Sequence, residues 1–271
     1  MLNQQTQLFQ NTVSTTSWQV ESESNINGLH LEELSLNALP ALQTCYYDGW
    51  IMRFADGYTK RANSVNPLYD TRLDVAEKVA YCESMYAVRK QPTVFKMTPF
   101  SQPGSLDEYL ARHDYRKETG ASVQVVDLDN LARAEGGARV TLSTSASEVW
   151  LSSYFRLNNL QERYLPTMRT ILNNVAPQKC LAAVFEDGTI AAQGLAVLDQ
   201  NYLGLFDIVT EPNLRQRGFG YQLLLYLLNW GKANGAEYAY LQVMPNNEPA
   251  LRLYEKLGFN EVYQYWYRVR W

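Results

Sequence analysis

Two arginines and two glycines lie close together near position 218, between an apolar segment and an amphipathic one. The run consists of Arg215, Gln216, Arg217, Gly218, Phe219 and Gly220. The first turn of a helix carries unpaired backbone N–H groups and the positive end of the helix dipole, and glycines let an anion approach that backbone closely. The arginines add positive charge and bidentate donors. This combination predicts a cradle for a phosphate group, whereas an ordinary tight turn is the alternative interpretation of the glycines alone.

Such a cradle requires a strand before it and a helix after it. Leu203–Thr210 is apolar and ends at Glu211-Pro212, where proline removes a donor from the strand ladder. We therefore expect a strand that stops at that point. From Tyr221 onward the apolar residues repeat on one helical face, at Leu223, Leu224, Leu227 and Leu228. The spacing places the glycine turn at the N-terminus of a helix.

A second motif follows the first. Tyr238–Val243 is expected to form a strand, and Asn246–Pro249 opens a short helix. Gly258 ends that helix and Phe259 follows it, as a glycine after the C-cap with a hydrophobic anchor does.

Together the two motifs resemble the GNAT superfamily of acyl-CoA N-acyltransferases. The matching positions of the second motif are Asn247, Ala250, Leu253, Tyr254, Lys256, Gly258 and Phe259. The resemblance covers residues 139–271 well, and the first half is loosely similar to the degenerate N-terminal half of tandem GNAT proteins. It implies an α/β (α+β) fold with a mixed, mostly antiparallel GNAT-type sheet flanked by helices, in two GNAT-like halves in tandem.

The resemblance also implies acetyl-CoA, or another acyl-CoA, as cosubstrate, with no metal. The strand before the glycine turn would diverge from the next strand and pair with the pantetheine arm through the backbone of Ile208, Val209 and Thr210. The pyrophosphate cradle would extend from Arg215 to Tyr221. Asn247 would contact the pantetheine or the adenosine portion.

The resemblance places a general acid on Tyr254, which would protonate the departing CoA thiolate. The alternative is that Tyr254 is a core residue between Leu253 and Leu257. An amine acceptor arrives protonated near pH 7, so a base is also needed. Asp207 is our candidate, either binding the ammonium or relaying its proton through water, and Glu211 is the second. A purely structural role for Asp207 stays open. Because no cysteine or serine lies in a nucleophile motif, we expect direct transfer.

Length and composition set the domain organisation. The 271 residues suffice for two domains, and 46% hydrophobic residues suit a globular core. We expect a polar tail over residues 1–28, a degenerate GNAT-like domain over 29–128, a linker over 129–137 and the acetyltransferase domain over 138–271. Within the first half, a hairpin is expected between residues 49 and 67, turning tightly at Asp56-Gly57.

Charge and apolar patterning argue against several classes of partner. A net charge of −4 and a pI near 5.4 disfavour nucleic acid binding, and no apolar stretch is long enough for a membrane helix. A signal sequence is not expected, so we expect a cytoplasmic protein. Cys45, Cys82 and Cys180 show no CxxC spacing, which argues against a disulfide framework or a zinc site. A monomer and a homodimer are both compatible with the sequence.

The sequence therefore predicts an N-acyltransferase that moves an acetyl group from acetyl-CoA to a primary amine of a small molecule or peptide. The alternative is a catalytically weak acyl-CoA sensor or regulatory module. Nucleotide binding is less favoured, because the Lys-Ser/Thr of a P-loop and the ribose-binding carboxylate of a Rossmann unit are not in place. Polar and aromatic residues of the first half form either a substrate pocket or a hairpin with an aromatic core face: Trp50, Arg53, Tyr58, Lys60, Arg61, Asn63, Ser64 and Asn66.

Overall fold

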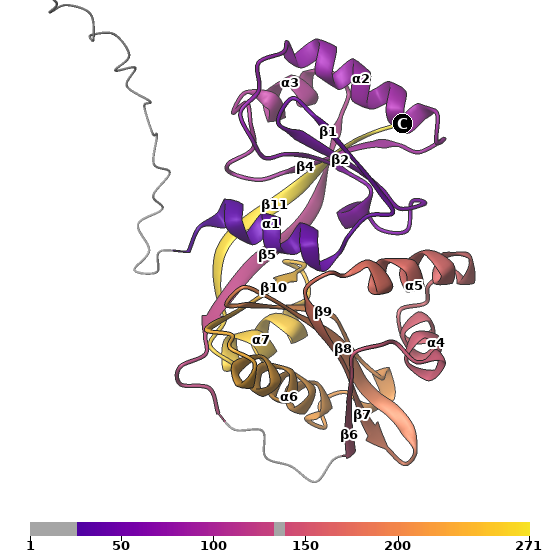
Figure 1. Cartoon of the computed structure of the whole chain (residues 1–271), viewed down its shortest axis with the longest axis vertical. Coiled ribbons are helices and arrows are strands. Elements are labelled where there is room, and N and C mark those ends of the chain that lie inside the picture. Colours follow the sequence, from indigo (N-terminus) through magenta and orange to yellow (C-terminus); the bar gives the residue numbers. More distant parts are fainter. Residues whose placement is uncertain (1–25, 133–138) are drawn as a thin grey trace, which may run out of the picture.

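One large sheet runs through the whole chain, and helices flank it (Figure 1). The computed structural model describes residues 26–132 and 139–271. The strands follow the order β1-β2-β3-β4-β11-β5-β10-β9-β8-β7-β6 across the sheet. Their bounds are β1 (Gln43–Tyr47), β2 (Trp50–Phe54), β3 (Val65–Pro67), β4 (Thr93–Met97), β5 (Arg116–Asp127), β6 (Arg139–Ser143), β7 (Gln178–Glu186), β8 (Thr189–Asp199), β9 (Tyr202–Thr210), β10 (Tyr238–Val243) and β11 (Asn260–Arg270).

Seven α-helices and three short 3₁₀ turns are present in the described residues. The helices are α1 (Gly28–Ala38), α2 (Val75–Ala87), α3 (Leu106–Arg112), α4 (Glu148–Leu157), α5 (Leu165–Asn174), α6 (Phe219–Ala233) and α7 (Glu248–Lys256). The 3₁₀ turns are Lys60–Ala62, Glu162–Tyr164 and Pro212–Leu214. None of the described helices is long and apolar enough to cross a membrane.

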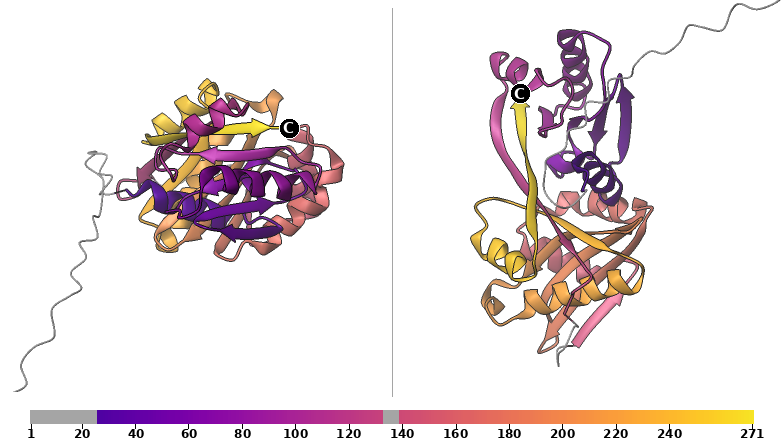
Figure 2. Two further views of the ribbon diagram at one scale, coloured as in Figure 1. Left: turned by 90° about the horizontal axis from the view of Figure 1, so that it is seen from above. Right: turned by 90° about the vertical axis from the view of Figure 1, so that its left-hand side faces the viewer.

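The same order of elements occurs twice along the chain. In the first half, β2 pairs antiparallel with β3, which pairs in parallel with β4 across α2, before α3 and β5. In the second half, β8, β9 and β10 repeat these pairings across α6, before α7 and β11. The last strands are exchanged, because β11 pairs with β4 and β5 pairs with β10. Figure 2 shows β5 and β11 running side by side between the two halves.

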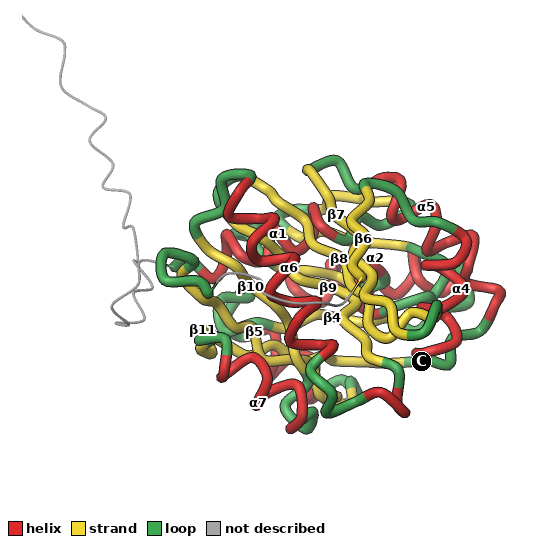
Figure 3. The backbone as a smooth tube through the Cα atoms, turned by 90° about the horizontal axis from the view of Figure 1, so that it is seen from below, coloured by secondary structure: helices red, strands yellow, loops and turns green. Residues whose placement is uncertain are grey.

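Alternating side chains divide the second half into two packed layers. On β7, Leu181 and Ala183 face the core that contains α4 and α5, whereas Cys180, Ala182 and Val184 face the core that contains α6 and α7. This alternation follows from the two-residue period of a strand, with both faces buried. Figure 3 shows the two helix pairs on opposite sides of the strands. The predicted mixed, mostly antiparallel sheet with flanking helices is confirmed.

Three features of the first half differ from, or extend beyond, the sequence prediction. Helix α1 was not expected; Asn27 caps it by accepting hydrogen bonds from the backbone of Leu29 and His30. The tight turn at Asp56-Gly57 is confirmed, because the Tyr58 backbone donates to the Ala55 carbonyl at 3.0 Å, but it does not join the paired strands directly, since residues 55–64 form a longer connection between β2 and β3. The predicted domain boundary at 129–137 stays a prediction, and residues 133–138 lie outside the described residues.

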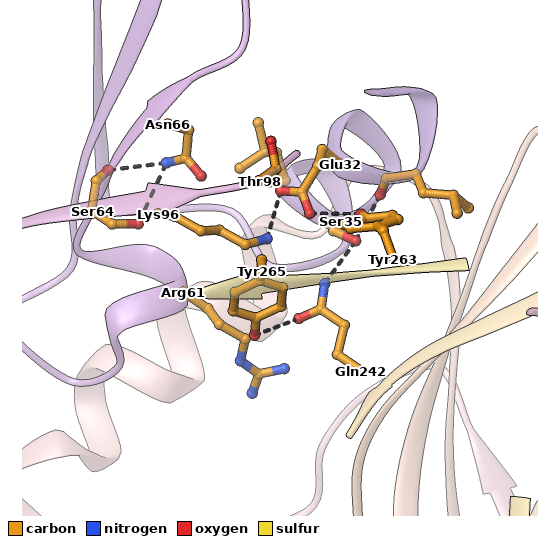
Figure 4. A network of polar contacts seen from close by, with 12 residues as sticks. Glu32, Ser35, Arg61, Ser64, Asn66, Lys96, Thr98, Gln242, Tyr263 and Tyr265 are labelled. Atoms are coloured by element: carbon orange, nitrogen blue, oxygen red, sulfur yellow. Dashed lines mark hydrogen bonds and ion pairs between the residues drawn. The ribbon is translucent and has the colours of Figure 1, made fainter. Parts of the chain in front are cut away.

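A buried ion pair connects α1 to the sheet near the junction of the halves (Figure 4). The Lys96 ammonium on β4 lies 2.5 Å from the Glu32 carboxylate on α1, and both side chains are almost completely buried. The Tyr263 hydroxyl on β11 donates to the same carboxylate at 2.7 Å. Nearby, Gln242 of β10 donates to Ser35 of α1 at 3.0 Å. The network therefore fixes α1 against strands from both halves.

Breaking this pair on one side should destabilise the protein strongly. Lys96→Met leaves the Glu32 charge buried without its partner, and Glu32→Leu does the same to Lys96, at a cost of about 3–5 kcal/mol each. The double variant Glu32→Leu/Lys96→Met removes both charges and should lose less than the sum of the single variants. Urea unfolding followed by circular dichroism measures these differences. Strictly additive losses would contradict the importance of the pairing.

Candidate active site

Strands β9 and β10 diverge in the middle of the sheet. Their parallel pairing runs from Tyr202 opposite Tyr238 to Leu205 opposite Leu241 and ends there. Beyond that point β10 continues to pair with β5, and β9 continues to pair with β8. Within the described residues, the segment from Phe206 to Thr210 thus has a strand on one edge only. An open edge of this kind offers backbone donors and acceptors to an extended ligand.

A β-bulge lies at the start of the open edge. The β8–β9 register shifts between Gln193 and Leu195, so that β9 has one residue more than β8 there. Asp207 lies in the bulge with φ of 54°, a conformation that is uncommon for residues other than glycine. Gly194 faces it, and a Cβ on Gly194 would lie only 2.4 Å from the Ile208 side chain. Gly194 leaves room for the Ile208 side chain, and the bulge sets the direction of the Asp207 side chain.

The Asp207 carboxylate is nearly buried and has two partners from different parts of the chain. The Tyr154 hydroxyl on α4 donates to Oδ1 at 2.9 Å, and the Arg61 guanidinium lies 3.5 Å from the same oxygen. Among the described residues, Oδ2 accepts no hydrogen bond. Burial and the Asp207 charge hold the pKa of Tyr154 well above its ordinary value, so the phenol stays a donor. Asp207 thus lies where the first half, α4 and the open edge of β9 meet.

The glycine turn forms the N-terminus of α6, as predicted. Gly218 is the N-cap residue with φ of 87°, in the left-handed region that glycine adopts without a steric penalty. Among the described residues, the backbone N–H groups from Gln216 to Tyr221 donate no hydrogen bond to the protein. Arg215 is exposed, whereas Arg217 lies 2.6 Å from Glu186. The turn therefore presents a set of free amides with a flanking cation, which suits an anion.

Tyr254 and Asn247 belong to α7, beside this turn. Tyr254 is almost buried and packs edge-to-face on Phe259, and burial raises its pKa to about 12. The Asn247 side chain caps α7 by accepting from the Ala250 backbone at 3.4 Å. Glu211, the second candidate base, lies 2.7 Å from Arg156. The acid role of Tyr254, the base roles and the cofactor contact of Asn247 stay predictions.

The corresponding sites of the first half are filled by the protein itself. The loop before α2 donates two backbone N–H groups, from Arg72 and Leu73, to the Asp48 carboxylate at 2.9 Å each. Hydrogen bonds from Thr71 and Leu73 hold the pKa of Asp48 well below its usual range. The edge of β3 is closed as well, because the Gln102 backbone donates to the Pro67 carbonyl at 2.8 Å. An aspartate and a loop thus occupy the places that are open in the second half.

The architecture and this site define a class of protein. A parallel strand pair that diverges, and a helix whose first amides are free after a glycine turn, match the arrangement that the resemblance to the GNAT superfamily implies. A family model described as "Probable histone acetyltransferase Rv0428c C-terminal" matches residues 24–268. The chain therefore belongs to this family, and it is an N-acetyltransferase of the GNAT superfamily.

Individual relatives agree with this assignment. An uncharacterized N-acetyltransferase of Bacillus subtilis (strain 168), YobR, is 28% identical over 243 residues, which cover 89% of this chain and 97% of that protein. The ribosomal protein bS18-alanine N-acetyltransferase of Salmonella typhimurium is 30% identical over 112 residues, 41% of this chain and 65% of that protein.

Solved structures show the same fold. A GCN5-related N-acetyltransferase from Kribbella flavida superimposes with a TM-score of 0.68 at 15% identity, over 91% of this chain and 96% of that one. A tandem GNAT protein from the clavulanic acid biosynthesis pathway gives 0.63 at 13% identity, over 89% and 87%. At these identities the comparison supports the fold alone.

Sequence reasoning located the glycine turn and the strand before it, but not the partners of Asp207. The glycine turn, Asp207 and the strand before it lie on one continuous edge, as the two motifs indicate. Tyr154 was not predicted as a site residue, because nothing in its sequence position points to a carboxylate on β9. Arg61 and Tyr58 were in the proposed first-half pocket, and both contact the second half. Most of the other pocket candidates are buried: Trp50, Arg53, Asn63, Ser64 and Asn66.

Tyr154→Phe should destabilise the protein by removing the short hydrogen bond to Asp207. A hydrogen bond to a charged group contributes about 1.5–3 kcal/mol, and the carboxylate has few alternative partners in its buried position. Tyr164→Phe is the matched control, because the Tyr164 hydroxyl contacts an exposed arginine. Chemical denaturation of both variants measures the difference. Equal losses in the two variants would show that the Tyr154 hydroxyl has no special importance.

Proposed function

We propose that this protein transfers an acetyl group from acetyl-CoA directly to a primary amine of a small molecule or peptide, at Asp207. The observation that supports this most is the continuity of the site. The open edge of β9 leads from the free amides at Gly218 to the carboxylate in the bulge. The pyrophosphate would lie on the amides, the pantetheine arm would pair with Ile208, Val209 and Thr210, and the thioester would reach Asp207.

The reaction would follow a direct path. Asp207 binds the ammonium of the acceptor and takes its proton, directly or through water, which leaves the nitrogen lone pair free. The nitrogen attacks the thioester carbonyl carbon, and a backbone amide near Val209 stabilises the oxygen as its charge grows. The nitrogen of the tetrahedral intermediate then loses its second proton to water, and the C–S bond breaks. CoA leaves as a thiolate that Tyr254 stabilises by donating a hydrogen bond to the sulfur, and water supplies the proton that makes the thiol. The acetamide and CoA are the products, and no covalent enzyme intermediate forms.

The acidity of Tyr254 determines how it contributes. A phenol with a pKa of about 12 is a weaker acid than a thiol, whose pKa is about 8.5. Full proton transfer to the thiolate is therefore uphill, and the main effect of Tyr254 would be a hydrogen bond to the sulfur as its charge develops. Because the pKa is raised, the phenol stays protonated throughout the neutral and mildly alkaline range. Its contribution should not change with pH between about 6 and 10.

For the acceptor we propose a chemical class, a primary amine of a small molecule or peptide. The Salmonella relative is named for the acetylation of an alanine of ribosomal protein bS18, and this supports including peptide amines. The carboxylate in the bulge supports a cationic acceptor in either case.

Cofactor binding should depend on the glycine turn. The double variant Arg215→Ala/Gly220→Leu should lose acetyl-CoA binding in calorimetry, because the variant loses a cation and a bulky side chain enters the cradle. A Cβ on Gly220 would already lie 3.0 Å from the Thr210 hydroxyl. The unaltered chain should bind one acetyl-CoA, since Asp48 fills the equivalent place of the first half.

Arg112→Ala on α3 is the control for loss of an exposed arginine, and Arg215→Ala alone separates the charge from the steric change. Unchanged affinity in a double variant that melts like the parent would overturn the cofactor assignment. A stoichiometry of two would contradict the closed state of the first half.

Tyr254→Phe should lower kcat about 10²–10³-fold while acetyl-CoA affinity changes little. Thiol release from acetyl-CoA, followed colorimetrically across amino acids, polyamines, aminoglycosides and peptides, is the assay. The phenylalanine keeps the packing on Phe259, so the fold should be preserved. An unaffected kcat would make Tyr254 a core residue only. If the chain binds acetyl-CoA but none of the amines causes thiol release, the protein is a sensor.

A further inference from the structure

Three cations lie next to the point where β9 and β10 diverge. A small cavity there, of about 10 Å³, has walls from both halves of the chain. It is lined by Ser35, Leu36, Leu39, Arg53, Arg61, Lys96, Phe206 and Gln242. The space holds about one water molecule, so it is no substrate pocket by itself. Its charged walls nevertheless lie directly beside the Asp207 carboxylate, because Arg61 belongs to both.

The charges around this cavity do not balance. Lys96 is paired with Glu32 at 2.5 Å, and Arg61 is paired with Asp207 at 3.5 Å. Arg53 is buried and has no carboxylate partner among the described residues. Its guanidinium donates only to backbone carbonyls, those of Leu36, Leu39 and Arg61. Three cations therefore share two carboxylates, and one positive charge is left over.

The surplus positive charge is present at neutral pH. Burial lowers the pKa of Arg53 to about 10, which still leaves it charged. A buried charge without a counter-ion is unfavourable, and the guanidinium group is suited to binding a carboxylate through two parallel hydrogen bonds. Arg53 itself is enclosed, whereas the Arg61 side chain is 30% exposed and its contact with Asp207 is long. Arg61 is therefore the group through which an outside anion can reach this positive region.

We propose that the acceptor is an amine with a carboxylate on the neighbouring carbon, that is, a free α-amino acid. This inference rests on the proposed function at Asp207. The ammonium binds Asp207 and the carboxylate binds the exposed side of Arg61. The 3.5 Å between these two groups requires the two charges of the acceptor to be close together. The acceptor brings one charge of each sign, so the net charge of the site is unchanged, and the positive region around Arg61 favours the end of the acceptor that carries the carboxylate.

The opposing interpretation is that Arg61 only neutralises Asp207. In that case a simple cationic amine would be the better acceptor, because it needs no binding of an anion. The two interpretations differ in what they predict for an amino acid and its amide. An α-amino acid amide has the same amine and side chain but a neutral carboxamide, so it tests the carboxylate alone.

Thiol release from acetyl-CoA should be measured with α-amino acids and with their amides as matched pairs. For the best acid the parent chain should show a kcat/KM about 10–100-fold above that of its amide, the size expected for a hydrogen bond to a charged group. Arg61→Ala should abolish this preference by lowering kcat/KM for the acid, with the amide affected much less. Arg61→Lys should restore part of the preference, since it keeps the charge but loses the bidentate geometry.

Arg116→Gln is the control, because Arg116 is an exposed cation that pairs with Glu118 instead of Asp207. It should leave the ratio of acid to amide unchanged. Amides that react as well as acids, or an Arg61→Ala that lowers both equally, would overturn the inference and leave the acetyltransferase function in place. No thiol release with any amine, while acetyl-CoA still binds, would instead overturn the proposed function and the inference with it. Arg61→Lys keeps the test decisive if Arg61→Ala does not fold.

Discussion

The functional site depends on one strand that has a pairing partner on only one edge. A buried strand normally satisfies its backbone on both sides, and unpaired N–H and C=O groups are costly away from water. β9 departs from this at Phe206, where β10 turns away toward β5. The open edge is stabilised on its other side by β8 and covered by α6 on one face and α4 on the other. A cosubstrate that supplies an extended, amide-rich arm can complete the ladder.

The bulge and the glycine turn lie at the two ends of that open edge. The extra residue on β9 turns Asp207 toward Tyr154 and α4, and the strand then ends before Pro212. The chain re-enters the fold at Gly218 with its first amides free. The first half repeats the same elements but not the open edge, since Asp48 and Gln102 fill the equivalent places. Because β5 and β11 are exchanged, each half contributes a strand that pairs with the other half. The first half is therefore needed to complete the sheet.

The sequence predicted the parts of the site that are local in the chain. A glycine turn between a strand and a leucine-bearing helix depends on neighbouring residues, and so does the Gly258 end of α7. The partners of Asp207 are different, because Arg61 and Tyr154 are 146 and 53 residues away from it and come from separate elements. The exchange of β5 and β11 was also out of reach, since strand order in a sheet depends on long-range packing. Helix α1 was missed because its cap, Asn27, follows directly on a long polar segment.

The two halves contribute different kinds of chemical group to the site. The free amides, the open edge and Tyr254 all come from the second half, and in the proposed function they face the acyl donor. Arg53, Arg61 and Lys96 come from the first half and line the small cavity beside Asp207, and Arg61 contacts that carboxylate. The donor side uses backbone groups, whose positions are fixed by the fold itself. The proposed acceptor side uses side chains, of which Arg53 and Lys96 are buried and Arg61, in the turn before β3, is partly exposed. A substitution at Arg61 can therefore change the charge that meets the acceptor while the backbone groups of the second half stay in place.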